Sequence, residues 1–149
     1  MRLWHYELLP YLPKGQLISQ KRECDLMFKD YLNDKKTNHI LINYVWEYDI
    51  SHLISYYVLL EEEFKRRHYY SFNKKILSKV LTKSGNFVEL IDKPFPDHHT
   101  TRYMIQNFFN LEEKFDRGQK DFYVAKYMYL YRYVNERTGF NVVEEDKLK

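Results

Sequence analysis

The chain contains very few of the residues that interrupt regular secondary structure. Only 4 glycines and 4 prolines occur in 149 residues, which is too few for an all-β protein that turns every few residues. Hydrophobic residues make up 44% and charged residues 30% of the sequence, a balance typical of a globular domain. The length suits one domain with a core of its own. We therefore predict a single compact all-α domain that covers residues 1–149.

Apolar residues recur every three or four positions in four segments, which predicts four amphipathic helices. We expect these helices at about residues 16–32, 49–64, 72–84 and 100–118. Asp49 or Ser51 can cap the second helix, and Thr100 or Thr101 begins the fourth. The pattern leaves open whether the second helix continues beyond residue 66 or kinks there.

Other segments lack such a clear period. Residues 1–14 predict an extended or irregular arm, because Pro10 and Pro13 block a continuous helix. Residues 39–46 fit either a buried helical turn or a strand. In residues 120–133 four tyrosines alternate as in a strand, yet other apolar residues of the same segment fit a helix. That helical alternative rests on Phe122, Ala125, Met128 and Arg132.

Features typical of secreted, membrane and cofactor-binding proteins are missing from the sequence. His5, Glu7 and Pro10 interrupt the apolar N-terminal stretch before it can form a signal peptide or a membrane span. A single cysteine, Cys24, excludes an internal disulfide framework and suits a reducing compartment. We therefore expect a cytoplasmic protein without membrane contact. The apolar helix position of Cys24 favours a buried structural thiol over a nucleophile.

Cofactor and metal motifs are also missing. The sequence has no Gly-rich phosphate loop and no cysteine pair for zinc. The adjacent residues His98 and His99 could ligate a metal, but neighbouring histidines usually point in different directions. We expect no cofactor and no metal.

Tyrosine and the basic residues give the first indication of a binding surface. The chain has 15 tyrosines, which suit surfaces on which bases stack and equally suit the edges of an apolar core. Basic residues cluster around Arg66 and Arg67. We expect these two arginines on a solvated face, away from any functional surface.

The N-terminus offers a possible nucleophile beside charged residues. Arg2 lies one residue from the free amine, and Arg22 and Glu23 are adjacent on the helix that follows the arm. An ordinary α-amino group has a pKa of ~7.7–8.0, so part of it is neutral and nucleophilic at cellular pH. Such an amine can attack a sugar C1′ carbon to form an imine, and a nearby carboxylate can stabilise the positive charge. Spacing alone still favours a solvated helix face for Arg22 and Glu23.

Two motifs, in this order, resemble those of the pyrimidine-dimer DNA glycosylase family. The segment Gln16-Leu-Ile-Ser-Gln-Lys-Arg-Glu23 is similar to the family's L-x-x-x-x-R-E helix. The segment Leu111-Glu-Glu-Lys-Phe115 resembles its L-D-E-K-I segment, also on a late helix. In that family an arginine directly follows the nucleophilic residue, as Arg2 follows Met1 here.

The resemblance implies a DNA glycosylase with an associated abasic-site lyase activity on damaged double-stranded DNA, with pyrimidine dimers as the candidate lesion. Met1 would supply the amine nucleophile and Glu23 the catalytic carboxylate. The implied DNA-binding residues are Arg2, Gln16, Arg22 and Lys114. Two alternatives remain: a nucleic-acid-binding protein of this fold without catalysis, and a helical module whose Tyr-rich C-terminal segment docks a protein.

Overall fold

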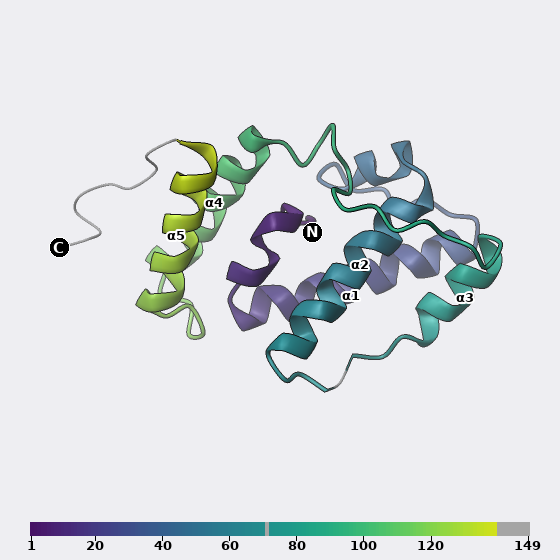
Figure 1. The fold of residues 1–149 in the computed structure, drawn as a ribbon, viewed down its shortest axis with the longest axis horizontal. Helices are drawn as coiled ribbons and strands as arrows, with labels where there is room; N and C mark the ends of the chain where they lie inside the picture. The colour runs from purple at the N-terminus through teal and green to yellow at the C-terminus, as the bar shows by residue number, and fades with distance from the viewer. Residues whose placement is uncertain (71, 140–149) are drawn as a thin grey trace.

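The computed structural model describes residues 1–70 and 72–139, and over these residues the chain is helical without a strand (Figure 1). This confirms the predicted all-α class. The elements are the 3-10 helices η1 (Tyr6–Tyr11) and η2 (Asn43–Glu47) and the α-helices α1 (Lys14–Leu32), α2 (Ile50–Arg66), α3 (Lys75–Lys83), α4 (Thr101–Asp116) and α5 (Val124–Thr138). None of the described helices is both long and apolar enough to cross a membrane.

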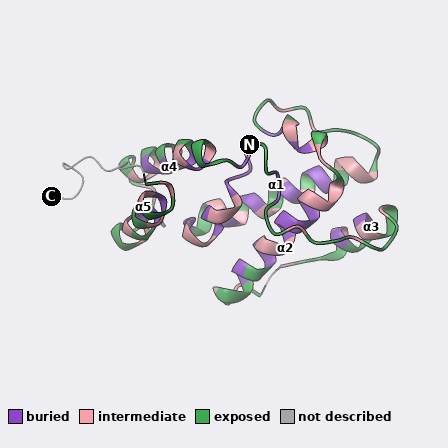
Figure 2. Cartoon of the chain, turned by 45° about the horizontal axis from the view of Figure 1, so that its top comes forward, coloured by how far each residue is buried: buried purple, intermediate pink, exposed green. Residues whose placement is uncertain are grey.

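The helices form two groups with the N-terminal segment between them (Figure 1). In one group α1 packs against α2 and α3, and in the other α4 packs against α5. The short helix η1 contacts both α2 and α5, so it joins the two groups. Figure 2 shows buried residues along α1, α2 and this N-terminal segment. The first residues of the chain therefore lie in the middle of the fold.

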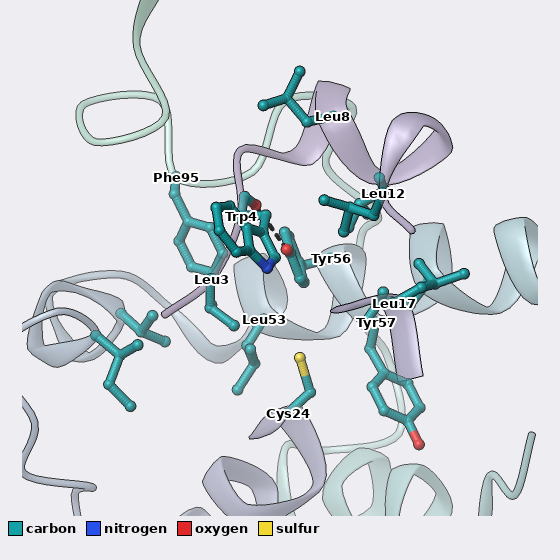
Figure 3. Close-up of a cluster of buried hydrophobic side chains, with 14 of the residues drawn as sticks. Leu3, Trp4, Leu8, Leu12, Leu17, Cys24, Leu53, Tyr56, Tyr57 and Phe95 are labelled. Atoms are coloured by element: carbon teal, nitrogen blue, oxygen red, sulfur yellow. Dashed lines mark hydrogen bonds between the residues drawn. The ribbon is translucent and has the colours of Figure 1, made fainter. Parts of the chain in front are cut away.

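The arm predicted for residues 1–14 is extended only over its first five residues. Tyr6 to Tyr11 then wind into η1, where the side chain of His5 accepts a hydrogen bond from the N–H of Glu7 at 3.1 Å. The arm sends Leu3, Leu8 and Leu12 into the core, and all three are fully buried (Figure 3). Burying one such side chain stabilises a fold by about 1.5–3 kcal/mol, so the arm is part of the core.

Polar caps and left-handed residues set the ends of the long helices. The side chain of Asp49 accepts from the N–H of Ser51 at 3.0 Å, and Thr100 caps α4 in the same way. The second helix ends at Arg66, shortly before His68, whose φ of +61° leaves the helical region. This answers the question that the sequence left open after residue 66. Gly85, at φ +101°, follows α3, in a backbone region that glycine enters without strain.

Both ambiguous segments are helical in the structure. Residues 39–46 lead into η2, which buries Val45. The segment 120–133 contributes most of α5, whose buried residues Tyr127, Leu130 and Val134 recur at spacings of three and four. Tyr129 is 60% exposed. The alternating tyrosines thus point around a helix, and the 3.6-residue period wins because it collects the buried positions on one side.

Arg67 contradicts the expectation of a solvated face. Its side chain is only 14% exposed and donates from Nε to Oε1 of the buried Glu63 at 2.7 Å. Its Nη2 also donates to the carbonyl oxygens of Leu9 and Pro10 at 3.3 and 3.1 Å. Arg66 is 61% exposed and pairs with the same carboxylate. The arginine pair therefore divides into one structural residue, which ties η1 to α2, and one surface residue.

This difference gives a stability prediction. Arg67→Ala should lower the free energy of unfolding by about 3 kcal/mol, because it removes one partner of a buried, hydrogen-bonded ion pair. Arg66→Ala should lower it by less than about 1 kcal/mol, as expected for an exposed ion pair. Urea unfolding of the two variants measures both values, and equal losses would contradict the different roles assigned to the two arginines.

Candidate active site

Buried polar side chains hold the backbone of the N-terminal arm. Gln20 of α1 is almost fully buried. Its Nε2 donates to the carbonyl oxygen of Arg2 at 2.8 Å, and its Oε1 accepts from the N–H of Trp4 at 2.7 Å. The Tyr56 hydroxyl lies 2.7 Å from the Trp4 carbonyl oxygen and 2.8 Å from Gln20 Oε1. A single carboxamide therefore binds two residues of the arm to α1.

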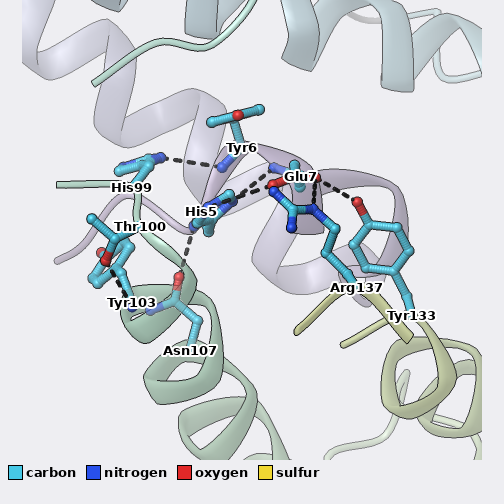
Figure 4. A network of polar contacts seen from close by, with 9 residues as sticks. All are labelled: His5, Tyr6, Glu7, His99, Thr100, Tyr103, Asn107, Tyr133 and Arg137. Atoms are coloured by element: carbon cyan, nitrogen blue, oxygen red, sulfur yellow. Dashed lines mark hydrogen bonds and ion pairs between the residues drawn. The ribbon is translucent and has the colours of Figure 1, made fainter. Parts of the chain in front are cut away.

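A second set of side chains holds the other side of the arm. The Tyr103 hydroxyl donates to the carbonyl oxygen of Leu3 at 2.6 Å, and Asn107 accepts from the N–H of His5 at 2.7 Å. His99 accepts from the N–H of Tyr6 through Nδ1 at 3.2 Å (Figure 4). These contacts come from α4 and the residue that precedes its cap. The arm is thus hydrogen-bonded along its backbone from residue 2 to residue 6.

The protonation of His99 follows from its burial. Burial lowers the pKa of His99 well below its ordinary range, so the ring is neutral. Since Nδ1 accepts from Tyr6, the proton is on Nε2, which donates to the Tyr44 hydroxyl at 2.8 Å. Tyr44 in turn donates to Tyr103, and Tyr103 donates to the Leu3 carbonyl. The hydrogen bonds of this chain all run in one direction, towards the arm.

This frame places Glu23 next to the start of the chain. Glu23 lies one turn after Gln20 and accepts from its Nε2 at 2.9 Å. It also accepts from the backbone N–H of Arg2, and the charge of the terminal ammonium acts on it. Burial raises the pKa of the half-buried Glu23 carboxyl, and these nearby donors and positive charges oppose the rise without cancelling it. Met1, Arg2 and Glu23 are therefore brought together.

The same site holds the Arg2 guanidinium over an aromatic ring. Its carbon Cζ lies 5.1 Å from the ring centre of Trp4, within the range of a cation–π contact. Arg2 is half-buried and Met1 is 40% exposed. An amine, a carboxylate and a guanidinium thus share one partly open site, a combination that can bind a phosphate, attack an electrophilic carbon and move a proton.

The other residues predicted for DNA binding lie elsewhere. Arg22 is exposed and lines a cavity with Lys14 and Tyr69, about 100° around α1 from Glu23. Gln16 lies about 10 Å along α1 from Glu23 and accepts from Gln119 Nε2 at 2.6 Å. The backbone of the same Gln119 donates to the Lys114 carbonyl oxygen at 3.2 Å. Gln16 and Lys114 therefore lie near each other at the far end of α1.

Cys24 and the adjacent histidines have structural surroundings. Cys24 is fully buried, and burial raises the pKa of its thiol well above the ordinary value, which confirms the structural interpretation. His98 contacts the Tyr48 hydroxyl at 2.6 Å, whereas His99 contacts Tyr44. Within residues 1–70 and 72–139 no group of three or more His, Cys, Asp or Glu side chains could hold a metal ion.

Sequence reasoning did not single out Gln20, Tyr103 or Asn107. One signal was available for Gln20, because it occupies an inward position between the buried residues Leu17 and Cys24. A glutamine on an apolar stripe must find hydrogen-bond partners inside the protein. The partners are backbone groups of the arm, and no residue pattern in the arm reveals them.

The raised pKa of Glu23 predicts a pH-dependent stability difference. The folded state favours the protonated carboxyl, so this contribution to stability is fully present below 4.5, the ordinary pKa, and is lost as the pH rises through the folded pKa. Glu23→Gln, which stays neutral, should therefore raise the melting temperature at pH 7.5 and leave it unchanged below pH 4. Glu113→Gln, at a 57% exposed side chain, is the matched control. A lower melting temperature of Glu23→Gln at pH 7.5 would contradict the prediction.

Comparison with known proteins gives one match. A family model described as pyrimidine dimer DNA glycosylase matches residues 1–77. No curated protein and no solved structure matches the chain. The matched residues include the arm, α1 and α2, and thus Met1, Arg2, Gln20 and Glu23, whereas Lys114 lies outside them.

Proposed function

The chain belongs to the pyrimidine dimer DNA glycosylase family, and from this premise we propose that it removes a damaged base from DNA and then cleaves the strand at the abasic site. One observation carries the proposal: the terminal amine and the Glu23 carboxylate meet at a site that Gln20 and the Arg2 N–H hold in place. Both groups come from the part of the chain that the family model matches.

The amine of Met1 is the proposed nucleophile. It attacks C1′ of the damaged nucleotide, so that a C–N bond forms and the glycosidic bond to the base breaks. The sugar ring then opens to an imine. Loss of a proton from C2′ expels the 3′ phosphate by β-elimination, and water releases the amine by hydrolysis of the imine. The amine is regenerated, and the reaction needs no oxidant.

Glu23 is the proposed catalytic carboxylate. As an anion it stabilises the positive charge that develops on the sugar as the base leaves. Its raised pKa brings the carboxyl closer to neutrality, where it exchanges protons more readily with the sugar and with C2′. Because Gln20 and the Arg2 N–H both donate to Glu23, the carboxylate keeps its place relative to the amine during these steps.

Four residues are proposed to contact the DNA. Arg2 lies in the active site and can bind a phosphate next to the damaged nucleotide. Arg22 lies on the adjoining face of α1. Gln16 and Lys114, near each other at the far end of α1, can contact the duplex about 10 Å from Glu23. Contacts to phosphates position the duplex and carry no base information.

Borohydride trapping on abasic-site DNA tests the nucleophile. Intact mass should show Met1 retained, and reduction should cross-link the DNA to the N-terminal peptide. Burial lowers the pKa of Lys126 to about 8, which makes Lys126 the strongest competing amine. Lys126→Arg should therefore trap as well as the wild type. A cross-link to Lys126 would overturn the Met1 assignment, and no cross-link at all would favour a DNA-binding protein or an interaction module without catalysis.

Glu23→Gln separates catalysis from binding. The variant keeps an oxygen that can accept from Gln20 and Arg2 but loses the negative charge, so turnover on dimer-containing duplex should fall by ~10²–10³. The affinity for that duplex should not fall, because no attraction to phosphate is lost. Single-turnover cleavage and equilibrium binding measure the two effects, with Glu113→Gln as the control. Wild-type cleavage by Glu23→Gln would show that Glu23 has no catalytic role.

A further inference from the structure

Two cavities lie beside α1 on the side away from Glu23. The first, of about 620 Å³, lies between α1 and α3, with Lys29, Lys75 and Lys79 in its lining. The second, of about 400 Å³, is lined by Lys14, Arg22 and residues near the end of α2. Both include Lys21 in their lining. They therefore form one surface feature, here called the basic groove.

The charge of the basic groove is one-sided. Its lining contains six cationic residues and one acidic residue, Asp25. The whole chain has 24 basic against 21 acidic residues, so this ratio is far from the average. The cationic residues are Lys14, Lys21, Arg22, Lys29, Lys75 and Lys79.

Most of this charge is available to a ligand. Lys29, Lys75 and Lys79 are exposed, and none of them forms an ion pair with a described residue. Lys21 is different, because it pairs with Asp25 at 2.6 Å and its ammonium lies 4.9 Å from the ring centre of Phe72. Lys21 is therefore a fixed positive charge where the cavities meet, and the exposed lysines surround it.

The start of α3 adds positive potential to the same place. Lys75 is the first residue of this helix, and its first turn contains no acidic residue. A helix N-terminus carries a partial positive charge and favours anions, so a lysine there is unfavourable for the isolated protein. An anion bound between α1 and α3 would compensate both charges.

Helix geometry separates the basic groove from Glu23. Lys21 and Glu23 are two residues apart, which places them about 200° apart around α1. The line of cations from Lys14 to Lys29 extends for about 22 Å along the helix. A linear polyanion fits this length better than a small anion does. The half-buried ring of Tyr69 lines the same groove and offers a surface for a base.

We propose that the basic groove binds a single strand of nucleic acid, separately from the duplex held at Glu23. Cations along a groove neutralise the phosphates of one strand, and an aromatic side chain stacks on a base. A duplex keeps its bases paired and cannot use Tyr69 in this way. The proposal does not depend on the chemistry at Glu23.

The test compares two double variants with the same change of charge. Lys75→Ala with Lys79→Ala removes two cations of the basic groove, and Lys93→Ala with Lys120→Ala removes two exposed cations outside its lining. The probe is an undamaged oligothymidylate of about 15 nucleotides. The groove variant should bind it more weakly and flatten the plot of log affinity against log salt by about 1.4. Cleavage of dimer-containing duplex at saturation should not change.

Stability and competition make the result decisive. Since Lys75 is unfavourable at a helix start, its loss should not lower the melting temperature, and weaker binding then reflects lost contacts. Three results would overturn the proposal: equal behaviour of the two double variants, an equal loss of affinity for intact duplex, or equal displacement of the oligothymidylate by polyglutamate of the same charge. The second result would assign the lysines to duplex binding, and the third to acidic partners in general.

Discussion

The geometry of the candidate active site depends on the hydrogen bonds of one buried carboxamide. Gln20 binds the carbonyl of Arg2, the N–H of Trp4 and the carboxylate of Glu23. Because Gln20 and Glu23 are one turn apart on the same rigid helix, the arm and the carboxylate share one reference frame. Loss of this amide would leave buried backbone groups without partners, at a cost of about 1–3 kcal/mol for each group. The distance between amine and carboxylate is therefore built into the core.

The arm is held through its backbone rather than through its polar side chains. Tyr103, Asn107 and His99 all bind main-chain atoms of residues 3–6, while Leu3 and Leu8 of the arm fill the core. Such attachment leaves the first two residues as the only part of the arm beyond the buried segment. A nucleophile at the end of a fixed segment loses little entropy on reaching a bound sugar, which is how positioning contributes to rate.

Much of the fold, but less of the site, could be predicted from the sequence. The stripes of α2 and α4 and the caps Asp49 and Thr100 follow from helical spacing and local hydrogen bonding, and the structure has them. Local patterns failed for Arg67, whose partners on η1 are more than fifty residues away. They also missed Gln20, because its partners are backbone atoms, which carry no residue identity. Glu23 could be proposed only because a motif resemblance outweighed its spacing.

The three sides of α1 explain how one short chain can combine these features. Its buried side contains Leu17, Gln20, Cys24, Met27 and Phe28. Glu23 lies at one edge of this side, and Lys21 lies at the opposite edge, about 200° away. A helix that buries less than half of its circumference leaves both edges accessible. Burial of Glu23 raises its pKa at some cost to folding, whereas the basic edge stays hydrated and costs little. The core can thus support a carboxylate on one side of α1 without drawing on the lysines on the other.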